Sequence, residues 1–140
     1  MKTEPRLLLS ASNQRISMIK GIGVDIVSIE RIEHWLDNSK LLERYFNTEE
    51  LSLASSRKNT AAQTLAARFA AKEALGKALG TGLKHITLKD IIVINDDNGK
   101  PEIKLIGTAR EALEKSGAGK VHISLSHESE NAIAMIVLEA

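Results

Sequence analysis

A helix expected over residues 60–79 constrains the fold of this chain more than any other segment. Eight of the sixteen alanines in the sequence lie between residues 61 and 78. With about 100° of rotation per residue, large apolar side chains fall on one side of this helix and alanines on the other. The large set is Leu65, Phe69, Leu75 and Leu79, and the small set is Ala67, Ala70, Ala71, Ala74 and Ala78. A helix that is apolar on both sides has no solvent face, so we expect it buried between other elements or packed closely on a second subunit.

Shorter elements flank this helix in an order that predicts an α+β fold. Apolar residues alternate with glycine and aspartate over 20–28, which predicts a strand whose apolar residues lie in the core. The other expected elements are two short helices within 29–46, a helix over 48–56 beginning at Thr48, strands over 86–94 and 102–106 joined by a turn at 97–99, a helix from Thr108 to Gly117, and strands over 121–126 and 132–138. Residues 1–17 show neither a helical nor a strand period, so we expect either a loose extension or sequence upstream of an internal start at Met18, followed by one domain at 18–140.

The ends of the two longer helices carry recognisable signals. Thr60 with Gln63, and Thr108 with Glu111, have the spacing of a capping box. Gly80 and Gly117 are expected to end the same helices, because glycine adopts the left-handed conformation that follows a helix.

Composition removes several classes of function. Lysine plus arginine number 19 and aspartate plus glutamate 18, so the net charge of +1 does not indicate a bulk nucleic-acid binder. One tryptophan, one tyrosine and two phenylalanines cannot build a base-stacking platform. The absence of cysteine excludes disulfides, thiolate nucleophiles and cysteine-bound zinc. No apolar run approaches the roughly 20 residues that cross a bilayer, so we expect a soluble, cytoplasmic protein without membrane contact.

Asp25 is the first candidate for a functional side chain. It interrupts an otherwise apolar strand, and an unpaired buried carboxylate costs several kcal/mol. By strand parity it shares a face with Gly21 and Gly23, which we expect to leave room for a ligand or a metal. The alternative is an acid that ends the strand and caps the following helix, and the strand pattern alone does not separate the two.

Four charged residues lie on the alanine-rich helix: Arg68, Lys72, Glu73 and Lys77. On a solvated helix they would need no explanation beyond their high helix propensity. The Glu73–Lys77 pair would add only about 0.2–0.5 kcal/mol to the stability of such a helix. On a helix without a solvent face, charges need defined partners, which favours a functional interpretation.

Asp25 and Glu73 together indicate a site for a hard divalent cation with oxygen ligands. Lys77 lies one turn after Glu73 and Arg68 about one turn before it, so we expect both cations at the same site. Such a set suits a magnesium-bound diphosphate during phosphoryl transfer. Residues 80–82 (GTG) follow a helix instead of opening one, so an ordinary P-loop nucleoside triphosphatase is disfavoured.

His127 ends the strand expected at 121–126 and begins a polar turn. It could contact a phosphate or a base there, or it could be an ordinary exposed turn histidine. A serine hydrolase built from Ser126, His127 and Asp25 is disfavoured, because neighbouring residues of a strand point to opposite faces and the chain has no nucleophile elbow.

Three segments share the order and spacing of a known family. They are residues 21–27 (GIGVDIV), 68–82 (RFAAKEALGKALGTG) and 121–127 (VHISLSH), and the turn at 98–101 (NGKP) also matches. Together they resemble the bacterial holo-[acyl-carrier-protein] synthases, which are small 4'-phosphopantetheinyl transferases. The resemblance extends from Met18 to about Glu139.

The resemblance implies an activity and a set of site residues. Members move the 4'-phosphopantetheine arm of coenzyme A to a serine of apo acyl carrier protein, release adenosine 3',5'-bisphosphate and require Mg²⁺. They supply the carrier for fatty acid biosynthesis. The positions matching their metal ligands are Asp25 and Glu73; Lys77 matches a lysine at the coenzyme A phosphates; Arg68, Lys72 and His127 match positions of the coenzyme pocket; and Arg31, with Lys40 and Arg44 by extension, matches the surface that meets the acidic carrier.

The resemblance also implies an antiparallel sheet with a long buried helix, assembled as a homotrimer with active sites between subunits. The alanine face agrees with close packing of this kind. Two alternatives stay open at this point. One is a non-catalytic nucleotide-binding or interaction protein that kept the pocket, and the other is a related transferase that modifies carriers of peptide or polyketide synthases.

Overall fold

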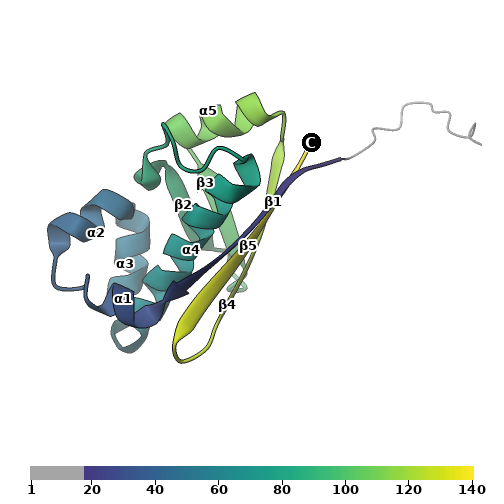
Figure 1. Ribbon diagram of the computed structural model, residues 1–140. Coiled ribbons are helices and arrows are strands. Elements are labelled where there is room, and N and C mark those ends of the chain that lie inside the picture. The colour runs from purple at the N-terminus through teal and green to yellow at the C-terminus, as the bar shows by residue number, and fades with distance from the viewer. Residues whose placement is uncertain (1–17) are drawn as a thin grey trace, which may run out of the picture.

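The long helix α4 (Ala61–Leu79) packs across one face of a three-stranded antiparallel sheet in the computed structural model, which describes residues 18–140 (Figure 1). The strand order is β1 (Ile19–Ser28), β5 (Asn131–Glu139), β4 (Lys120–His127), so β5 is central. Asp25 pairs with Ala134 of β5 in this register. The extension expected at 1–17 lies outside the described residues.

Glycines of β1 and alanines of α4 fit each other closely. A Cβ atom added to Gly21 would overlap the carbonyl oxygen of Ala78, and one added to Gly23 would overlap that of Ala74. The strand and the helix therefore meet backbone to backbone. This corrects one expectation, because the space over Gly21 and Gly23 is filled by α4 and not kept for a ligand or a metal. Of the two packings expected for the alanine face, the structure shows burial between elements of the same chain. The predicted burial of the helix is confirmed.

A two-stranded antiparallel hairpin, β2 (Ile91–Asn95) and β3 (Pro101–Leu105), forms a separate sheet. The turn expected between these strands is confirmed, with Gly99 at φ +84°. The strand expected over 86–94 is wrong for residues 86–90, where the chain turns and forms a 3₁₀ helix at Leu88–Asp90. Here the Leu88 carbonyl accepts a hydrogen bond from the Lys72 side chain and not from a strand neighbour.

Three short helices, α1 (Ile29–Glu33), α2 (Ser39–Tyr45) and α3 (Thr48–Ser56), lie beside the beginning of α4 (Figure 1). A 3₁₀ helix at Lys58–Thr60 leads into α4, and α5 (Gly107–Ser116) precedes β4. Four aromatic rings hold this helical layer to α4, with centroids 5.2–6.4 Å apart: Trp35, Tyr45, Phe46 and Phe69. These four rings are all the aromatic residues of the sequence.

Both expected capping boxes are wrong, whereas the expected glycine ends are confirmed. The Thr60 hydroxyl bonds to the Arg57 carbonyl, and the Thr108 hydroxyl bonds to Asp90, so neither threonine caps its helix. The capping box is instead at α3, where Asn47 and not Thr48 is the N-cap and Glu50 is its partner. Gly80 and Gly117 adopt the left-handed conformation after α4 and α5.

The sheet face opposite α4 is apolar and exposed in the single chain. Ile22, Val24 and Ile26 of β1 are 54–60 % exposed, and Ile133 and Met135 of β5 are each 41 % exposed. Parity explains this, since the glycines and Asp25 point toward α4 and the alternate side chains point away. The expectation that the apolar residues of β1 belong to the core is therefore wrong for Ile22, Val24 and Ile26.

None of the helices in residues 18–140 has both the length and the hydropathy of a membrane span.

Candidate active site

The crossing of β1 and α4 brings Asp25 and Lys77 together. Lys77 donates a hydrogen bond from Nζ to Asp25 Oδ1 at 3.1 Å and another to the backbone oxygen of Val24 at 3.0 Å. The Asp25 side chain is 18 % exposed and the Lys77 side chain 57 %. The half-buried carboxylate thus has a cationic partner that remains open to solvent on its other side.

Glu73 lies one helical turn before Lys77 and is half-buried. Burial raises the pKa of Glu73, and the nearby Asp25 carboxylate raises it further, while Arg31 and Lys77 act in the opposite direction. The two carboxylates are therefore close enough to repel each other. A cation between them would relieve that repulsion.

The donor chemistry of this pair fits Mg²⁺. Residues 18–140 contain no group of three or more histidine, aspartate or glutamate side chains arranged to hold a metal ion. Mg²⁺ does not need such a cage, because it keeps several waters and is bound through one or two carboxylates together with substrate phosphates. Asp25 and Glu73 form a pair of carboxylates of the kind that could hold this ion.

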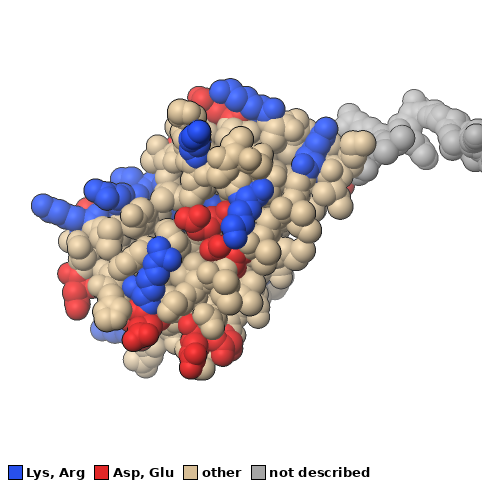
Figure 2. All heavy atoms as spheres, in the orientation of Figure 1, with Lys and Arg blue, Asp and Glu red and all other residues tan. Residues whose placement is uncertain are grey.

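Arg31 lies beside the same cluster. Its guanidinium carbon is 5.3 Å from the ring centroid of Trp35 and 5.4 Å from that of Phe69. Phe69 is one turn before Glu73 on α4, and the charge of Arg31 lowers the pKa of Glu73. Lys40 and Arg44 are exposed on the neighbouring helix α2. Figure 2 shows basic and acidic side chains interspersed over one face of the molecule, without one large patch of either sign.

Arg68 does not join this cluster, which corrects the expectation of one site with both cations. Five residues separate Arg68 from Glu73, so their side chains point about 140° apart around α4. Arg68 and His127 instead line a cavity of about 310 Å³ near the start of α4, together with Arg57, Gln63 and Asn95. Two of the predicted coenzyme residues, Arg68 and His127, are thus brought together, but away from the carboxylates.

The Arg68 side chain is almost completely buried in the wall of this cavity, with 3 % of the residue exposed. Nη1 donates to the Thr64 carbonyl at 3.4 Å and Nη2 to Asn95 Oδ1 at 3.2 Å. Nε is buried and has no hydrogen-bond partner among residues 18–140. Burial lowers the pKa of Arg68, the Glu50 carboxylate opposes this, and the Arg57 charge adds to it.

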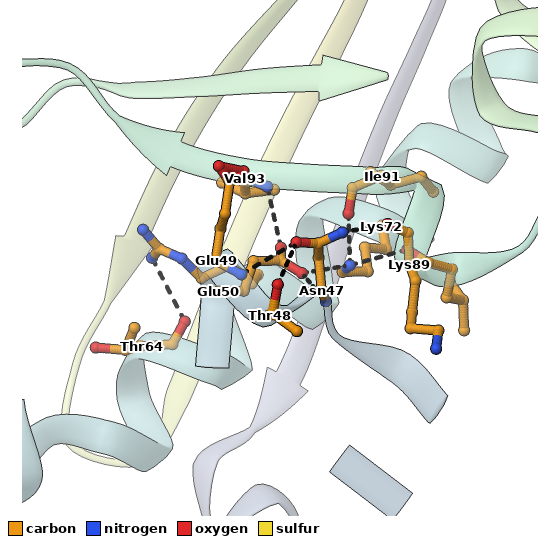
Figure 3. Close-up of polar contacts among 11 residues, drawn as sticks. Asn47, Thr48, Glu49, Glu50, Thr64, Lys72, Lys89, Ile91 and Val93 are labelled. Carbon is orange, nitrogen blue, oxygen red and sulfur yellow. Dashed lines mark hydrogen bonds and ion pairs between the residues drawn. The ribbon is translucent and has the colours of Figure 1, made fainter. Parts of the chain in front are cut away.

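Lys72 contradicts the expectation that it lines the coenzyme pocket. It is fully buried and donates from Nζ to Glu50 Oε1 at 2.8 Å, to the Leu88 carbonyl at 2.9 Å and to the Ile91 carbonyl at 2.6 Å (Figure 3). These bonds use all three donors of the ammonium group. Burial lowers the pKa of Lys72 and Glu50 opposes that shift. Lys72 ties α4 to α3 and β2.

The geometry also excludes the hydrolase arrangement. Asp25 is on β1 and His127 on β4, and the central strand β5 separates these outer strands. Adjacent strands lie about 4.8 Å apart, so the two side chains come from backbones roughly 10 Å apart. Ser126, His127 and Asp25 therefore do not form a triad.

Three polar residues of these sites escaped the sequence analysis. Glu50 is fully buried and accepts from the backbone N–H of Asn47 at 2.9 Å and of Val93 at 3.0 Å. The spacing of Asn47 and Glu50 is a capping-box signal that could have drawn attention to it. Arg57, at the end of α3, and Asn95, at the end of β2, carry no local signal, because their importance depends on what lies across the cavity.

Comparison with known proteins identifies the family. Residues 21–135 match the family model of the 4'-phosphopantetheinyl transferase superfamily. A holo-[acyl-carrier-protein] synthase of Treponema denticola is 54 % identical over 122 residues, which are 87 % of this chain and 99 % of the relative. One from Geobacter sp. (strain M21) is 50 % identical over 125 residues, again covering 87 % of this chain and 99 % of the relative.

A solved structure has the same fold. The holo-(acyl-carrier-protein) synthase of Bacillus anthracis, crystallised in complex with CoA (3',5'-ADP), is 41 % identical to this chain. The TM-score is 0.72, and the match covers 88 % of this chain and 98 % of that one. The Helicobacter pylori synthase in complex with coenzyme A is 33 % identical, with a TM-score of 0.72 and coverage of 84 % and 98 %. The chain therefore belongs to the 4'-phosphopantetheinyl transferase superfamily, among the holo-[acyl-carrier-protein] synthases.

Proposed function

We propose that the cluster of Asp25, Glu73 and Lys77 is the chemical centre of the reaction that family membership assigns to this chain. That reaction is the transfer of 4'-phosphopantetheine from coenzyme A to a serine of apo acyl carrier protein. The observation that carries the proposal is the meeting of two mutually repelling carboxylates and an exposed ammonium group where β1 crosses α4. Phosphoryl transfer needs such an arrangement to neutralise charge on phosphate oxygens.

Asp25 and Glu73 would hold Mg²⁺, which would supply positive charge to the diphosphate of coenzyme A. Lys77 stands next to Asp25 with its ammonium group open to solvent, so it can bind a diphosphate oxygen and stabilise the departing phosphate. The carrier serine oxygen attacks the phosphorus that bears the pantetheine arm, and its hydroxyl proton is released to the surrounding water. The bond from that phosphorus to the bridging oxygen breaks, and adenosine 3',5'-bisphosphate leaves.

The cavity of Arg68 and His127 is the proposed site for another phosphate of coenzyme A. It is lined by two arginines and a histidine, and Arg68 has unused donors there. Guanidinium groups suit phosphate because their planar donors match its oxygens. The coenzyme bound by the Bacillus anthracis and Helicobacter pylori relatives agrees with a coenzyme site in this chain.

The two halves of this site would come from neighbouring copies of the chain. The carboxylate cluster borders the outer strand β1, whereas His127 is on the opposite outer strand β4. In a ring, the β1 side of one subunit meets the β4 side of the next. The exposed apolar sheet face, which includes Ile22, Val24 and Met135, supports association, because exposed apolar patches mark interfaces. A homotrimer with sites between subunits is the proposed assembly.

The carrier protein would dock on α1 and α2. Arg31 lies next to Glu73, and Lys40 and Arg44 continue the basic residues along α2. A basic surface beside the reacting groups suits an acidic partner. The proposed setting is fatty acid biosynthesis in the cytoplasm, where the holo carrier is used.

A single mass measurement tests the function. The protein is incubated with coenzyme A, Mg²⁺ and apo acyl carrier protein, and the mass of the intact carrier is followed. We expect the carrier to gain one phosphopantetheine group. Coenzyme A binding without any transfer would favour a non-catalytic binding protein, and modification only of peptide- or polyketide-synthase carriers would favour the related transferases. Either result would overturn the proposed substrate or activity.

A further inference from the structure

We infer that Asn95 is a positioning residue, which holds the Arg68 guanidinium in place for a phosphate without neutralising its charge. The inference rests on the proposed function in one respect, that Arg68 binds a phosphate of coenzyme A. It assigns a role in phosphate binding to a residue of a different element, the hairpin strand β2.

Arg68 depends on Asn95 for its orientation. Of the five N–H donors of a guanidinium group, one bonds to the Thr64 carbonyl of the same helix and one to Asn95 Oδ1. Within residues 18–140, Asn95 provides the one side-chain acceptor that Arg68 contacts. The buried Nε has no partner among these residues, and one N–H on each of Nη1 and Nη2 is also unused, so Arg68 keeps donor capacity in the cavity wall.

The chemistry of the acceptor matters as much as its position. A carboxylate at the place of Asn95 would form a charge-assisted pair with Arg68 and compete with an incoming phosphate. A neutral amide oxygen orients the guanidinium and leaves its full positive charge for the ligand. The charges nearest to Arg68 agree with this arrangement, because Glu50 is already paired with Lys72, and Arg57 adds a second positive charge to the cavity.

The buried pair of Glu50 and Lys72 fixes the strand that carries Asn95. Glu50 Oε2 accepts from the Val93 N–H at 3.0 Å, and Lys72 donates to the Ile91 carbonyl at 2.6 Å (Figure 3). Residues 91, 93 and 95 share one face of β2, and Ile91 and Val93 are fully buried. These two hydrogen bonds, four and two residues before Asn95, therefore hold the strand that carries it.

The test measures coenzyme A affinity by titration calorimetry, with the whole chain and without carrier. We expect Asn95→Asp to weaken binding about tenfold or more, because the new carboxylate pairs with Arg68. Asn95→Ala should weaken binding about three- to tenfold, through loss of one hydrogen bond to a charged group. Asn38→Asp makes the same chemical change at the N-cap of α2, away from the cavity, and should leave the affinity unchanged.

A double-mutant cycle with Arg68→Gln separates the inference from the function on which it rests. If Arg68→Gln leaves coenzyme A affinity unchanged, the proposed coenzyme site is wrong. If Arg68→Gln weakens binding and Asn95→Asp does not, only the role of Asn95 is wrong. If both weaken it, Asn95→Asp should have no further effect in the Arg68→Gln background. An undiminished effect in that background, or a loss of thermal stability without a loss of affinity, would also overturn the inference.

Discussion

Lys77 Nζ lies 3.1 Å from Asp25 Oδ1, so the proposed metal ligand and the proposed phosphate ligand are hydrogen-bonded to each other. The lysine neutralises Asp25 when no metal is bound. In the proposed mechanism, a cation bound to Asp25 would compete with this bond and would free the Lys77 ammonium for a phosphate oxygen. The residues of the centre are thus coupled before any substrate is present.

Lys77→Met should bind Mg²⁺ more tightly than the native chain while transferring phosphopantetheine more slowly. The exposed ion pair that competes with the metal is worth at most about 1 kcal/mol, so we expect a gain in metal affinity of about two- to fivefold. Calorimetry in the absence of coenzyme A measures it. Lys115→Met, on α5, is the matched control. A variant at Lys77 with unchanged or weaker metal affinity would show that the two do not compete.

Glu73→Ala and Glu73→Gln should lose phosphopantetheine transfer, by about 100-fold or more, and keep the fold. The reason is the loss of one of two carboxylates proposed to hold Mg²⁺. Carrier mass and circular dichroism give the two readouts. Glu111→Gln, on the exposed side of α5, should transfer normally. Near-normal transfer by the Glu73 variants with Mg²⁺ supplied would refute the assignment.

The raised pKa of Glu73 predicts a pH dependence of stability in the metal-free protein. Burial and Asp25 raise this pKa above its ordinary value of 4.5, against the effects of Arg31 and Lys77. Between the ordinary and the raised value the folded chain binds more protons than the unfolded chain, so the free energy of unfolding falls as pH rises through that window. Glu73→Gln should remove this contribution. Urea unfolding of both proteins in the presence of a chelator, at several pH values, measures the difference in the free energy of unfolding between the native chain and Glu73→Gln. This difference should fall as pH rises, and an increase would contradict the prediction.

Lys72→Met should destabilise the protein by about 3–5 kcal/mol, because it leaves the buried Glu50 carboxylate without its cation. Denaturant unfolding measures this loss. Adding Glu50→Gln to Lys72→Met should recover part of the stability, since the second change removes the unpaired charge. If Lys72→Met instead weakened coenzyme A binding at full stability, the assignment of Lys72 to the core would be wrong.

The proposed sharing of each site between neighbouring subunits predicts complementation between inactive variants. Glu73→Ala damages the carboxylate half and Arg68→Gln the cavity half, so a mixed oligomer contains some sites with two intact halves. With random mixing of equal amounts, about a quarter of the sites should be intact. The variants are refolded together and assayed for transfer. Activity no greater than the average of the separate variants would contradict sites between subunits.

The sequence was sufficient to predict the long helix and the meeting of Asp25 with Glu73 and Lys77, because both depend on local periodicity and on the family motifs. It could not predict the fate of Lys72, whose partner Glu50 lies 22 residues away on another helix. The hydrogen bonds of Lys72 also explain why the strand predicted over 86–94 is wrong at residues 86–90. The Leu88 carbonyl, which would bond to a neighbouring strand, accepts a hydrogen bond from Lys72 instead. Helical geometry alone could have separated Arg68 from Glu73, since five residues are not a whole number of turns.

The fit of Gly21 and Gly23 against the α4 backbone has a consequence for motion in the active centre. Side chains between two elements can change rotamer and let those elements drift, but two backbones in contact leave no such freedom. The distance between Asp25 and Glu73 is therefore set by the position of β1 against α4. Rotamer changes of side chains elsewhere have little effect on it. Mobility in this centre should be confined to the end of Lys77, which in the proposed mechanism leaves Asp25 to bind a phosphate oxygen.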